Sequence, residues 1–395
     1  MNTRVILLRH GESTYNALGL YQGSSDESVL TETGRQQARQ TGEFLKEIEF
    51  DAIYTSSLKR ARSTACEVLG IMNPKLDPES IHVVHQLREA NLPAWQGISF
   101  KQVRSKFAAD YWCWKQTPHK LKMRLPRSEQ NSLDNEYIYP ALDLYDRVEQ
   151  FWQEVLPRHK NQTLLLATHG GTNRALISTA LGISPALFHT IQQSNCGISV
   201  LNFSEAKPGK ARLEALNLAT HIGETLPQVK EGGKGRRLLL VPEGIIHPTQ
   251  SSKLAELLAG VLIDFSLCND LDTSHAIADA ILENHPETLQ LQVAKQDFAK
   301  LWHNTLSVKS DLNNDKLITG LVVASTAQIK TLFAEILGIK SDRLSSLQLQ
   351  PGTLSAIHYP NSNHPPIFQA INILGFNPVG NSKIESASRF SSAIA

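Results

Sequence analysis

Short apolar runs alternate with amphipathic segments along the first half of the chain. The continuous apolar runs at residues 5–8 and 164–168 predict strands that are buried on both faces of a sheet. Residues 31–48 carry apolar side chains on one side of a predicted helix, which Thr31 would cap. The same reasoning predicts strands at residues 52–55, 197–202 and 213–218 and helices at residues 58–69 and 172–181. This alternation indicates an α/β domain with a largely parallel sheet.

The second half of the chain repeats part of this pattern. Residues 164–183 align with residues 320–339 without a gap, and both segments end in Leu-Gly-Ile. Residues 214–218 and 369–373 match at nearly the same offset along the chain. The pattern therefore predicts a second copy of the first fold. Two unrelated α/β pieces that share strand and helix chemistry are the alternative interpretation.

Length, charge and cysteine usage further limit the possible domain organisation and class of protein. A chain of 395 residues is long for one core, and the glycine-rich, charged stretch 227–237 predicts a linker between domains at residues 1–230 and 238–395. The net charge of +1 gives no overall attraction for nucleic acid, and no apolar run is long enough to span a membrane. The four cysteines show no CxxC spacing, and we expect reduced thiols in a cytoplasmic protein.

The most informative polar residues stand where the opening strand ends. Arg9 and His10 follow the apolar run, and Gly11 allows the chain to turn closely past whatever they bind. The donor fork of an arginine fits phosphate oxygens, and a histidine can attack phosphorus without a metal. His169 directly follows the strand predicted at residues 164–168. Because ligands bind at the carboxyl ends of strands in such sheets, we expect one shared site.

The run Arg-His-Gly-Glu at residues 9–12, with Asn16 shortly after it, resembles the signature of the histidine phosphatase (phosphoglycerate mutase-like) superfamily. The resemblance extends over residues 5–222. It implies a three-layer α/β/α domain, followed here by a degenerate copy of the same fold. It also implies that His10 is the nucleophile that forms a phosphohistidine, and that Arg9 and Asn16 are phosphate ligands.

Three further segments match the family in the expected chain order. Arg60, in Ser-Ser-Leu-Lys-Arg, matches the arginine that binds phosphate from the opposite side. Glu89 matches the acid that protonates the leaving group and later activates water. His169, in His-Gly-Gly, matches the second histidine, which stabilises the transferring phosphoryl group. The amide of Gly170 would begin a helix and is therefore placed for an anion.

Residues near the predicted site favour hydrolysis over phosphoryl transfer to a second metabolite. Gln22 and Gly23 match the family's substrate loop and are expected to contact the non-phosphate part of the substrate. Mutases of the family resemble one another in having Glu-Arg at the acid, whereas Ala90 follows Glu89 here. The resemblance therefore implies a metal-independent phosphomonoesterase that acts on a small phosphate ester without a cofactor. A cofactor-dependent phosphoglycerate mutase, a phosphoserine phosphatase and a regulatory protein that uses the second half are the alternatives.

The predicted lid over residues 91–139 concentrates positive charge. Its basic side chains are Lys115, His119, Lys120, Lys122, Arg124 and Arg127. One interpretation is that they attract a substrate with further acidic groups, such as a carboxylated sugar phosphate. The other interpretation is a solvated basic loop.

The second half lacks these chemical groups. The matching positions hold Val241 and Pro242 in place of Arg9 and His10, Ser325 in place of His169, and Asp270 or Leu271 in place of Arg60. A phosphatase domain followed by such a copy resembles the two-domain proteins of photosynthetic organisms related to 2-carboxyarabinitol 1-phosphate phosphatase. We expect the empty copy to cover apolar surface, to regulate, or to form the interface of a homodimer.

Overall fold

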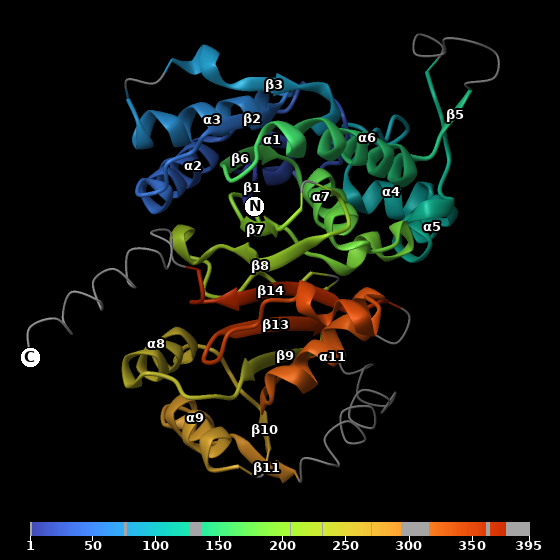
Figure 1. The fold of residues 1–395 in the computed structure, drawn as a ribbon. Helices are drawn as coiled ribbons and strands as arrows, with labels where there is room; N and C mark the ends of the chain where they lie inside the picture. The colour runs from blue at the N-terminus through green and yellow to red at the C-terminus, as the bar shows by residue number, and fades with distance from the viewer. Residues whose placement is uncertain are drawn as a thin grey trace, which may run out of the picture.

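The computed structural model describes the chain at residues 2–74, 77–126, 136–205, 207–230, 232–269, 271–293, 316–360 and 364–376. Its strands are β1 (Thr3–Arg9), β2 (Ala52–Ser56), β3 (His82–Val84), β4 (Met123–Arg124), β5 (Tyr137–Ile138), β6 (Thr163–Thr168), β7 (Ile198–Phe203), β8 (Ala211–Leu218), β9 (Gly235–Pro242), β10 (Phe265–Asn269), β11 (Leu289–Val293), β12 (Leu317–Ala324), β13 (Leu354–Tyr359) and β14 (Ile367–Ile373). Within the described residues, twelve of them form one sheet that runs through the molecule from β3 to β11 (Figure 1). The remaining two, β4 and β5, pair with each other.

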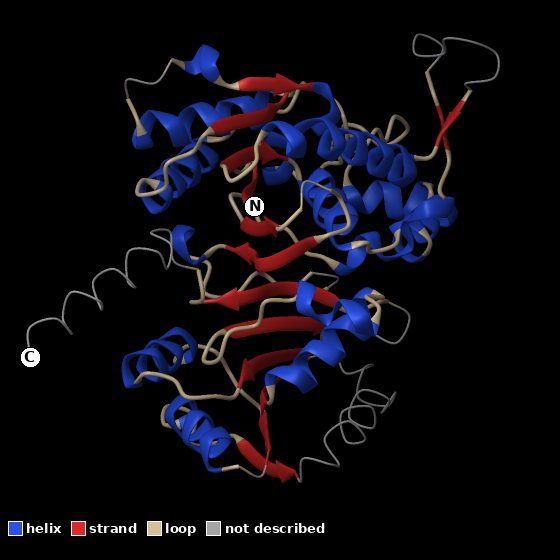
Figure 2. Ribbon diagram, in the orientation of Figure 1, coloured by secondary structure: helices blue, strands red, loops and turns tan. Residues whose placement is uncertain are grey.

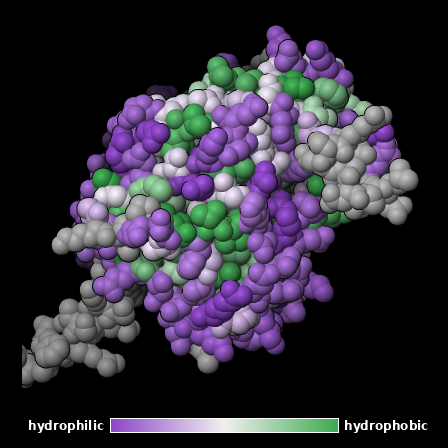
Figure 3. Space-filling model, turned by 90° about the horizontal axis from the view of Figure 1, so that it is seen from above, coloured by the Kyte–Doolittle hydropathy of each residue, from purple (hydrophilic) through white to green (hydrophobic). Residues whose placement is uncertain are grey.

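Helices cover both faces of this sheet. The described α-helices are α1 (Thr14–Ala17), α2 (Glu32–Leu45), α3 (Lys59–Met72), α4 (Phe100–Lys106), α5 (Ala108–Gln116), α6 (Pro140–Val155), α7 (Gly170–Leu181), α8 (Pro248–Leu258), α9 (Asp272–Leu282) and α11 (Thr326–Leu337). Helices α2, α3, α8 and α9 pack on one face, and α6, α7 and α11 pack on the other (Figure 2). The outer surface seen from above is mainly hydrophilic, with apolar patches between (Figure 3).

Strand β1 shows how the apolar pattern produces these layers. Successive side chains of a strand point to opposite faces of the sheet. Val5 and Leu7 join the core beneath α6 and α7, whereas Ile6 and Leu8 join the core beneath α2 and α3. All four side chains are fully buried. The three-layer fold that the resemblance implied is therefore confirmed in the first half of the chain.

The predicted elements of the first half match the structure within a few residues, but the sheet is not largely parallel. Strand β1 pairs in parallel with β6 and antiparallel with β7, and β7 pairs antiparallel with β8. The sheet is thus mixed, because β7, which follows α7, lies antiparallel to β1 and forms a hairpin with β8. The predicted cap of α2 is present, since Thr31 Oγ1 accepts a hydrogen bond from Gly34 N at 3.0 Å.

The two halves of the sheet share one strand order about a central pair. From the middle outwards, the first half runs β8-β7-β1-β6-β2-β3 and the second runs β14-β13-β9-β12-β10-β11. Strands β8 and β14 pair antiparallel. Across this pair, Asn217 Nδ2 donates to Gln369 O at 2.7 Å, and Asn372 Nδ2 donates to Glu214 O at 2.6 Å. The connection between the halves is therefore a continuous sheet with reciprocal hydrogen bonds.

The predicted linker at residues 227–237 is too long at its C-terminal end. Strand β9 begins at Gly235, before the apolar run that we expected to open it. Arg236 and Arg237 lie buried within this strand. Arg237 Nε donates to Gln369 Oε1 at 3.0 Å, and Arg237 Nη2 donates to Pro227 O at 3.1 Å. Hydrogen bonds across the sheet thus accommodate a charged residue that composition alone assigns to a loop.

Candidate active site

Two parallel strands end side by side, and each is followed by a histidine. Arg9 at the end of β1 lies opposite Thr168 at the end of β6. His10 N donates to Thr168 O at 2.9 Å, and His169 occupies the N-cap position of α7. The ring centroids of His10 and His169 lie 5.2 Å apart. The fold therefore brings both predicted imidazoles to the same edge of the sheet.

His10 is held in one tautomer. Its Nδ1 lies 2.7 Å from the carbonyl oxygen of Gly11, which can only accept a hydrogen bond. The proton must therefore be on Nδ1, and Nε2 keeps a lone pair. The ring is buried, and this burial lowers the pKa of His10 well below 6.5, with further lowering by Arg60 and Arg9. His10 thus favours the neutral imidazole form, with the lone pair of Nε2 left for another partner.

Half-buried Arg9 and fully buried Arg60 place two guanidinium groups beside His10. Arg60 Nη1 and Nη2 donate to the carbonyl oxygens of Ser25 and Gly23 at 2.7 and 2.9 Å, and Arg9 Nη1 donates to Gln193 O at 2.8 Å. Burial lowers the pKa of each arginine to about 10, so both carry their charge at neutral pH. The Nε atoms of both have no hydrogen-bond partner within the described chain. These donors can serve an anion.

His169 is completely buried behind His10. Its Nε2 lies 2.7 Å from Ser56 Oγ at the end of β2, and its Nδ1 has no hydrogen-bond partner within the described residues. Burial lowers the pKa of His169 well below 6.5, and the charges of Arg60, His10 and Arg9 add to this effect. The hydroxyl of Ser56 can donate or accept, so this contact leaves the tautomer of His169 open.

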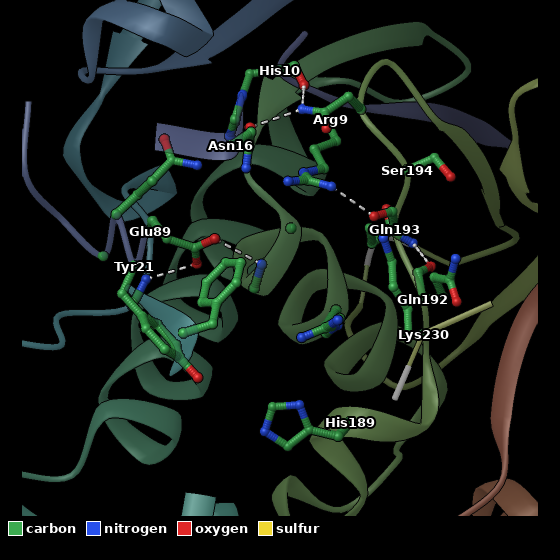
Figure 4. Close-up of a pocket in the computed structure, with 18 of the residues that line it drawn as sticks. Arg9, His10, Asn16, Tyr21, Glu89, His189, Gln192, Gln193, Ser194 and Lys230 are labelled. Carbon is green, nitrogen blue, oxygen red and sulfur yellow. Dashed lines mark hydrogen bonds between the residues drawn. The ribbon is translucent and has the colours of Figure 1, made fainter. Parts of the chain in front are cut away.

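Glu89 is fixed through both of its carboxylate oxygens. Oε1 accepts from Ala90 N and Oε2 accepts from Gly171 N, each at 2.8 Å (Figure 4). A Cβ at position 171 would stand 2.3 Å from Oε1, so the close approach requires glycine there. Arg147, which sequence reasoning did not single out, donates to the backbone carbonyls of Arg88 and Glu89. This arginine of α6 therefore anchors the loop that carries Glu89.

Comparison with known proteins agrees with this geometry. Residues 5–217, more than half of the chain, match the histidine phosphatase superfamily (branch 1). The chain belongs to the histidine phosphatase superfamily. A 2-carboxy-D-arabinitol-1-phosphatase from Triticum aestivum is 32% identical over 303 residues, which are 70% of this chain but only 57% of that relative. A probable 2-carboxy-D-arabinitol-1-phosphatase from Arabidopsis thaliana is 26% identical over 91% of this chain and 84% of the relative. Phosphoserine phosphatase 1 from Hydrogenobacter thermophilus is 30% identical over 56% of this chain and 95% of the relative.

A cavity of about 670 Å³ opens in front of His10 in this member of the superfamily (Figure 4). The predicted residues that line it are Arg9, His10, Asn16, Gln22, Gly23, Arg60, Glu89 and Gly170. His169 does not line it, because it lies behind His10. The Asn16 amide oxygen accepts a hydrogen bond from Asn195 Nδ2 at 3.1 Å and lies 3.0 Å from Ser13 Oγ. Ser13 Oγ also lies 2.9 Å from Gln22 Oε1.

Sequence reasoning missed one side of the cavity, residues 191–195, which we name the wall segment. Gln193 O accepts the hydrogen bond from Arg9, and Asn195 Nδ2 donates to His10 O at 3.0 Å. Ser194 N donates to Asn217 Oδ1 at 2.6 Å. The run Gln-Gln-Ser-Asn is polar although most of it is buried, and this mismatch is the signal that could have revealed it.

The predicted basic lid cluster is largely outside the site. Among the lid's described basic residues, Lys115 lines the cavity, whereas Lys120, Lys122 and Arg124 are exposed elsewhere. Arg127 lies outside the described residues. Trp114 is buried at the cavity, while Trp112 is 43% exposed and lies beneath Arg104. The lid therefore contributes one cation to the cavity from its described part, and its other described lysines are solvated.

No helix in the described ranges is long and apolar enough to cross a lipid bilayer. All four cysteines are free, and Cys196 and Cys268 are buried. The described residues contain no group of three or more histidine, cysteine, aspartate or glutamate side chains that could hold a metal ion.

Proposed function

We propose that this chain is a phosphomonoesterase that transfers the phosphoryl group of a small ester first to His10 and then to water. The observation that supports this most strongly is the fixed tautomer of His10 beside Arg9 and Arg60. Gly11 O holds the proton on Nδ1 at 2.7 Å, which leaves Nε2 for attack. Arg9 and Arg60 both line the cavity beside His10, and their guanidinium groups suit the oxygens of one phosphate dianion.

In the first step, the Nε2 lone pair of His10 forms a bond to phosphorus, and the bond from phosphorus to the ester oxygen breaks. The leaving oxygen takes a proton from the Glu89 carboxyl group, which becomes a carboxylate. In the second step, Glu89 removes a proton from water as the oxygen attacks phosphorus and the bond to His10 breaks. Arg9, Arg60 and His169 stabilise the phosphoryl oxygens throughout.

We further propose that the substrate is an acidic metabolite and that carboxylated sugar phosphates, of which 2-carboxyarabinitol 1-phosphate is one example, are the leading candidate class. The names of the wheat and Arabidopsis relatives support this class. The second half is proposed to be a degenerate copy of the catalytic domain. Its strand order and the reciprocal bonds of Asn217 and Asn372 support that proposal.

Trapping of the covalent intermediate tests the reaction. Protein incubated briefly with a radiolabelled phosphate ester and denatured in alkali is expected to retain label on His10, because phosphohistidine survives alkali but not acid. His10→Ala is expected to abolish label and turnover, whereas His82→Ala, an exposed residue outside the cavity, serves as the matched control. Label on any other residue would contradict the mechanism. Strict dependence of activity on 2,3-bisphosphoglycerate would instead favour a mutase.

A further inference from the structure

The cavity extends well beyond the phosphate end and is lined by both halves of the chain. His10 and His189 lie at opposite ends of the pocket drawn in Figure 4. Of the lining residues, Lys230 comes from the connection between the halves, and His364 and Ile367 come from the second half. The long cavity is therefore not a property of the catalytic half alone. We name Lys115, Arg174, His189, Lys230 and His364 the distal cluster.

The surroundings of His189 in the distal cluster are electropositive. His189 is only 8% exposed, and its Nε2 has no hydrogen-bond partner within the described residues. Burial lowers the pKa of His189 well below 6.5, and Lys115, Arg174 and His364 lower it further through their charges. Three separate cationic or titratable groups therefore lie close enough to this one ring to act on it.

The charge balance of the whole cavity has the same sign. Five side chains with a permanent positive charge line it, namely Arg9, Arg60, Lys115, Arg174 and Lys230, against the three acids Glu12, Glu89 and Glu224. Each acid already accepts a hydrogen bond from a neutral group: Glu12 from Thr31 Oγ1, Glu89 from two amides, and Glu224 from Ser194 Oγ. Two of the five cations flank His10, Lys115 and Arg174 act on His189, and Arg174 also acts on Arg9, so positive charge runs from the phosphate end of the cavity to His189.

The second half also holds the wall segment between the two ends. Gln192 N donates to Phe368 O in β14 at 2.8 Å, and Gln192 Nε2 donates to Gln228 O at 2.9 Å. Arg174 Nε donates to Ile191 O at 2.7 Å, and its guanidinium lies 5.5 Å from the centre of the Phe188 ring. The position of a distal cation therefore depends on a segment that is bonded to the second half.

We propose that the distal cluster is a second anion subsite, shared between the two halves, that selects phosphate esters with a carboxylate remote from the phosphate. This inference rests on the proposed function, because the phosphate end must hold the ester. It gives the second half a role in substrate selection without any chemistry of its own.

A pair of six-carbon esters tests the subsite directly. 6-Phosphogluconate and sorbitol 6-phosphate differ only at the end remote from phosphate, where one has a carboxylate and the other a hydroxymethyl group. Binding is measured by calorimetry in a His10→Ala background, so that no ester is consumed. We expect 6-phosphogluconate to bind at least about tenfold more tightly, and Lys115→Met with Lys230→Met to remove about tenfold of that preference.

Two further variants complete the experiment. His364→Ala changes the second half alone and is expected to reduce the preference about threefold. Lys253→Met, an exposed lysine of α8 outside the cavity, is expected to leave the preference unchanged. Equal affinity for the two esters, or a preference that the lysine variants leave intact, would overturn the subsite. If the unaltered protein releases phosphate from neither ester while the binding preference holds, the subsite is supported and the proposed hydrolysis fails.

Discussion

The two halves of the sheet have the same strand order but carry different polar side chains at the matching strand ends. At the end of β1 and in the first turn of α3 after β2, the Nε donors of Arg9 and Arg60 have no partner within the described chain. At the matching end of β9, Glu243 Oε2 accepts from Ser274 Oγ at 2.6 Å and from Asn269 Nδ2 at 3.2 Å. The second half thus supplies its own carboxylate where the first has donors available for a ligand. A sheet end becomes a binding site only where the chain does not satisfy its own donors.

The helix that follows each strand end shows the same contrast. Ser325 caps α11, because its Oγ accepts from Gln328 N at 3.2 Å in a complete capping box. His169 holds the matching position before α7 and makes no side-chain cap bond. Instead, Gly171 N in the first turn of α7 donates to Glu89. The first half therefore gives up a stabilising cap, worth about 1 kcal/mol, to place a histidine and a carboxylate.

The largest effect that would sharpen this contrast is expected from Arg60→Met. It removes one of the two charged donors beside His10, a position that the second half fills with Leu271 or with Asp270, which lies outside the described residues. We expect kcat/KM for phosphate release to fall about a thousandfold. Arg62→Met, on the exposed side of the same helix, is the control. Circular dichroism separates loss of function from loss of fold, and near-normal activity in a folded variant would remove Arg60 from the proposed phosphate site.

The next effect is expected from Gly171→Ala, since the aligned position of the second half is Ala327. An added Cβ would stand 2.3 Å from Glu89 Oε1, so the carboxylate must move. We expect kcat to fall about a hundredfold, because small displacements of a proton donor are costly. Ala327→Gly is the reciprocal control and is expected to leave kcat unchanged. Full activity of the alanine variant would contradict the proposed acid and base role of Glu89.

Local sequence patterns predicted the strand ends but not the surroundings of the cavity. Arg9 and His10 directly follow an apolar run, so their place at a sheet edge depends only on neighbouring residues. The contact of Gln192 with Phe368 depends on how the two halves pair, which no local pattern contains. The lid shows the opposite error. Its charge is concentrated in sequence, yet Lys115 is the one described lid cation that the fold turns into the cavity.

Acid stability distinguishes the two halves by a smaller amount. The pKa values of His10 and His169 are lowered well below 6.5 in the folded protein, and the aligned positions of the second half lack histidine. Below pH 6.5 the unfolded chain binds protons on these rings and the folded chain does not. The free energy of unfolding therefore falls as the pH is lowered. Between pH 7 and pH 5.5, we expect each ring to lower the free energy of unfolding by about 1 kcal/mol. Urea unfolding of His10→Asn with His169→Asn should show a shallower pH dependence than the unaltered protein, and an unchanged slope would contradict burial of the neutral rings.

The smallest effect is expected from Ser325→Ala, which removes the cap that the second half has and the first half lacks. We expect the free energy of unfolding to fall by about 1 kcal/mol, because Gln328 N loses its acceptor at the start of α11. Phosphate release should not change, since Ser325 does not line the cavity. Ser252→Ala within α8 is the control and should change stability by less than about 0.5 kcal/mol. If Ser325→Ala lowered kcat/KM while stability held, the end of β12 would be coupled to the catalytic half, and the second strand end would not be merely the internally satisfied counterpart of the first.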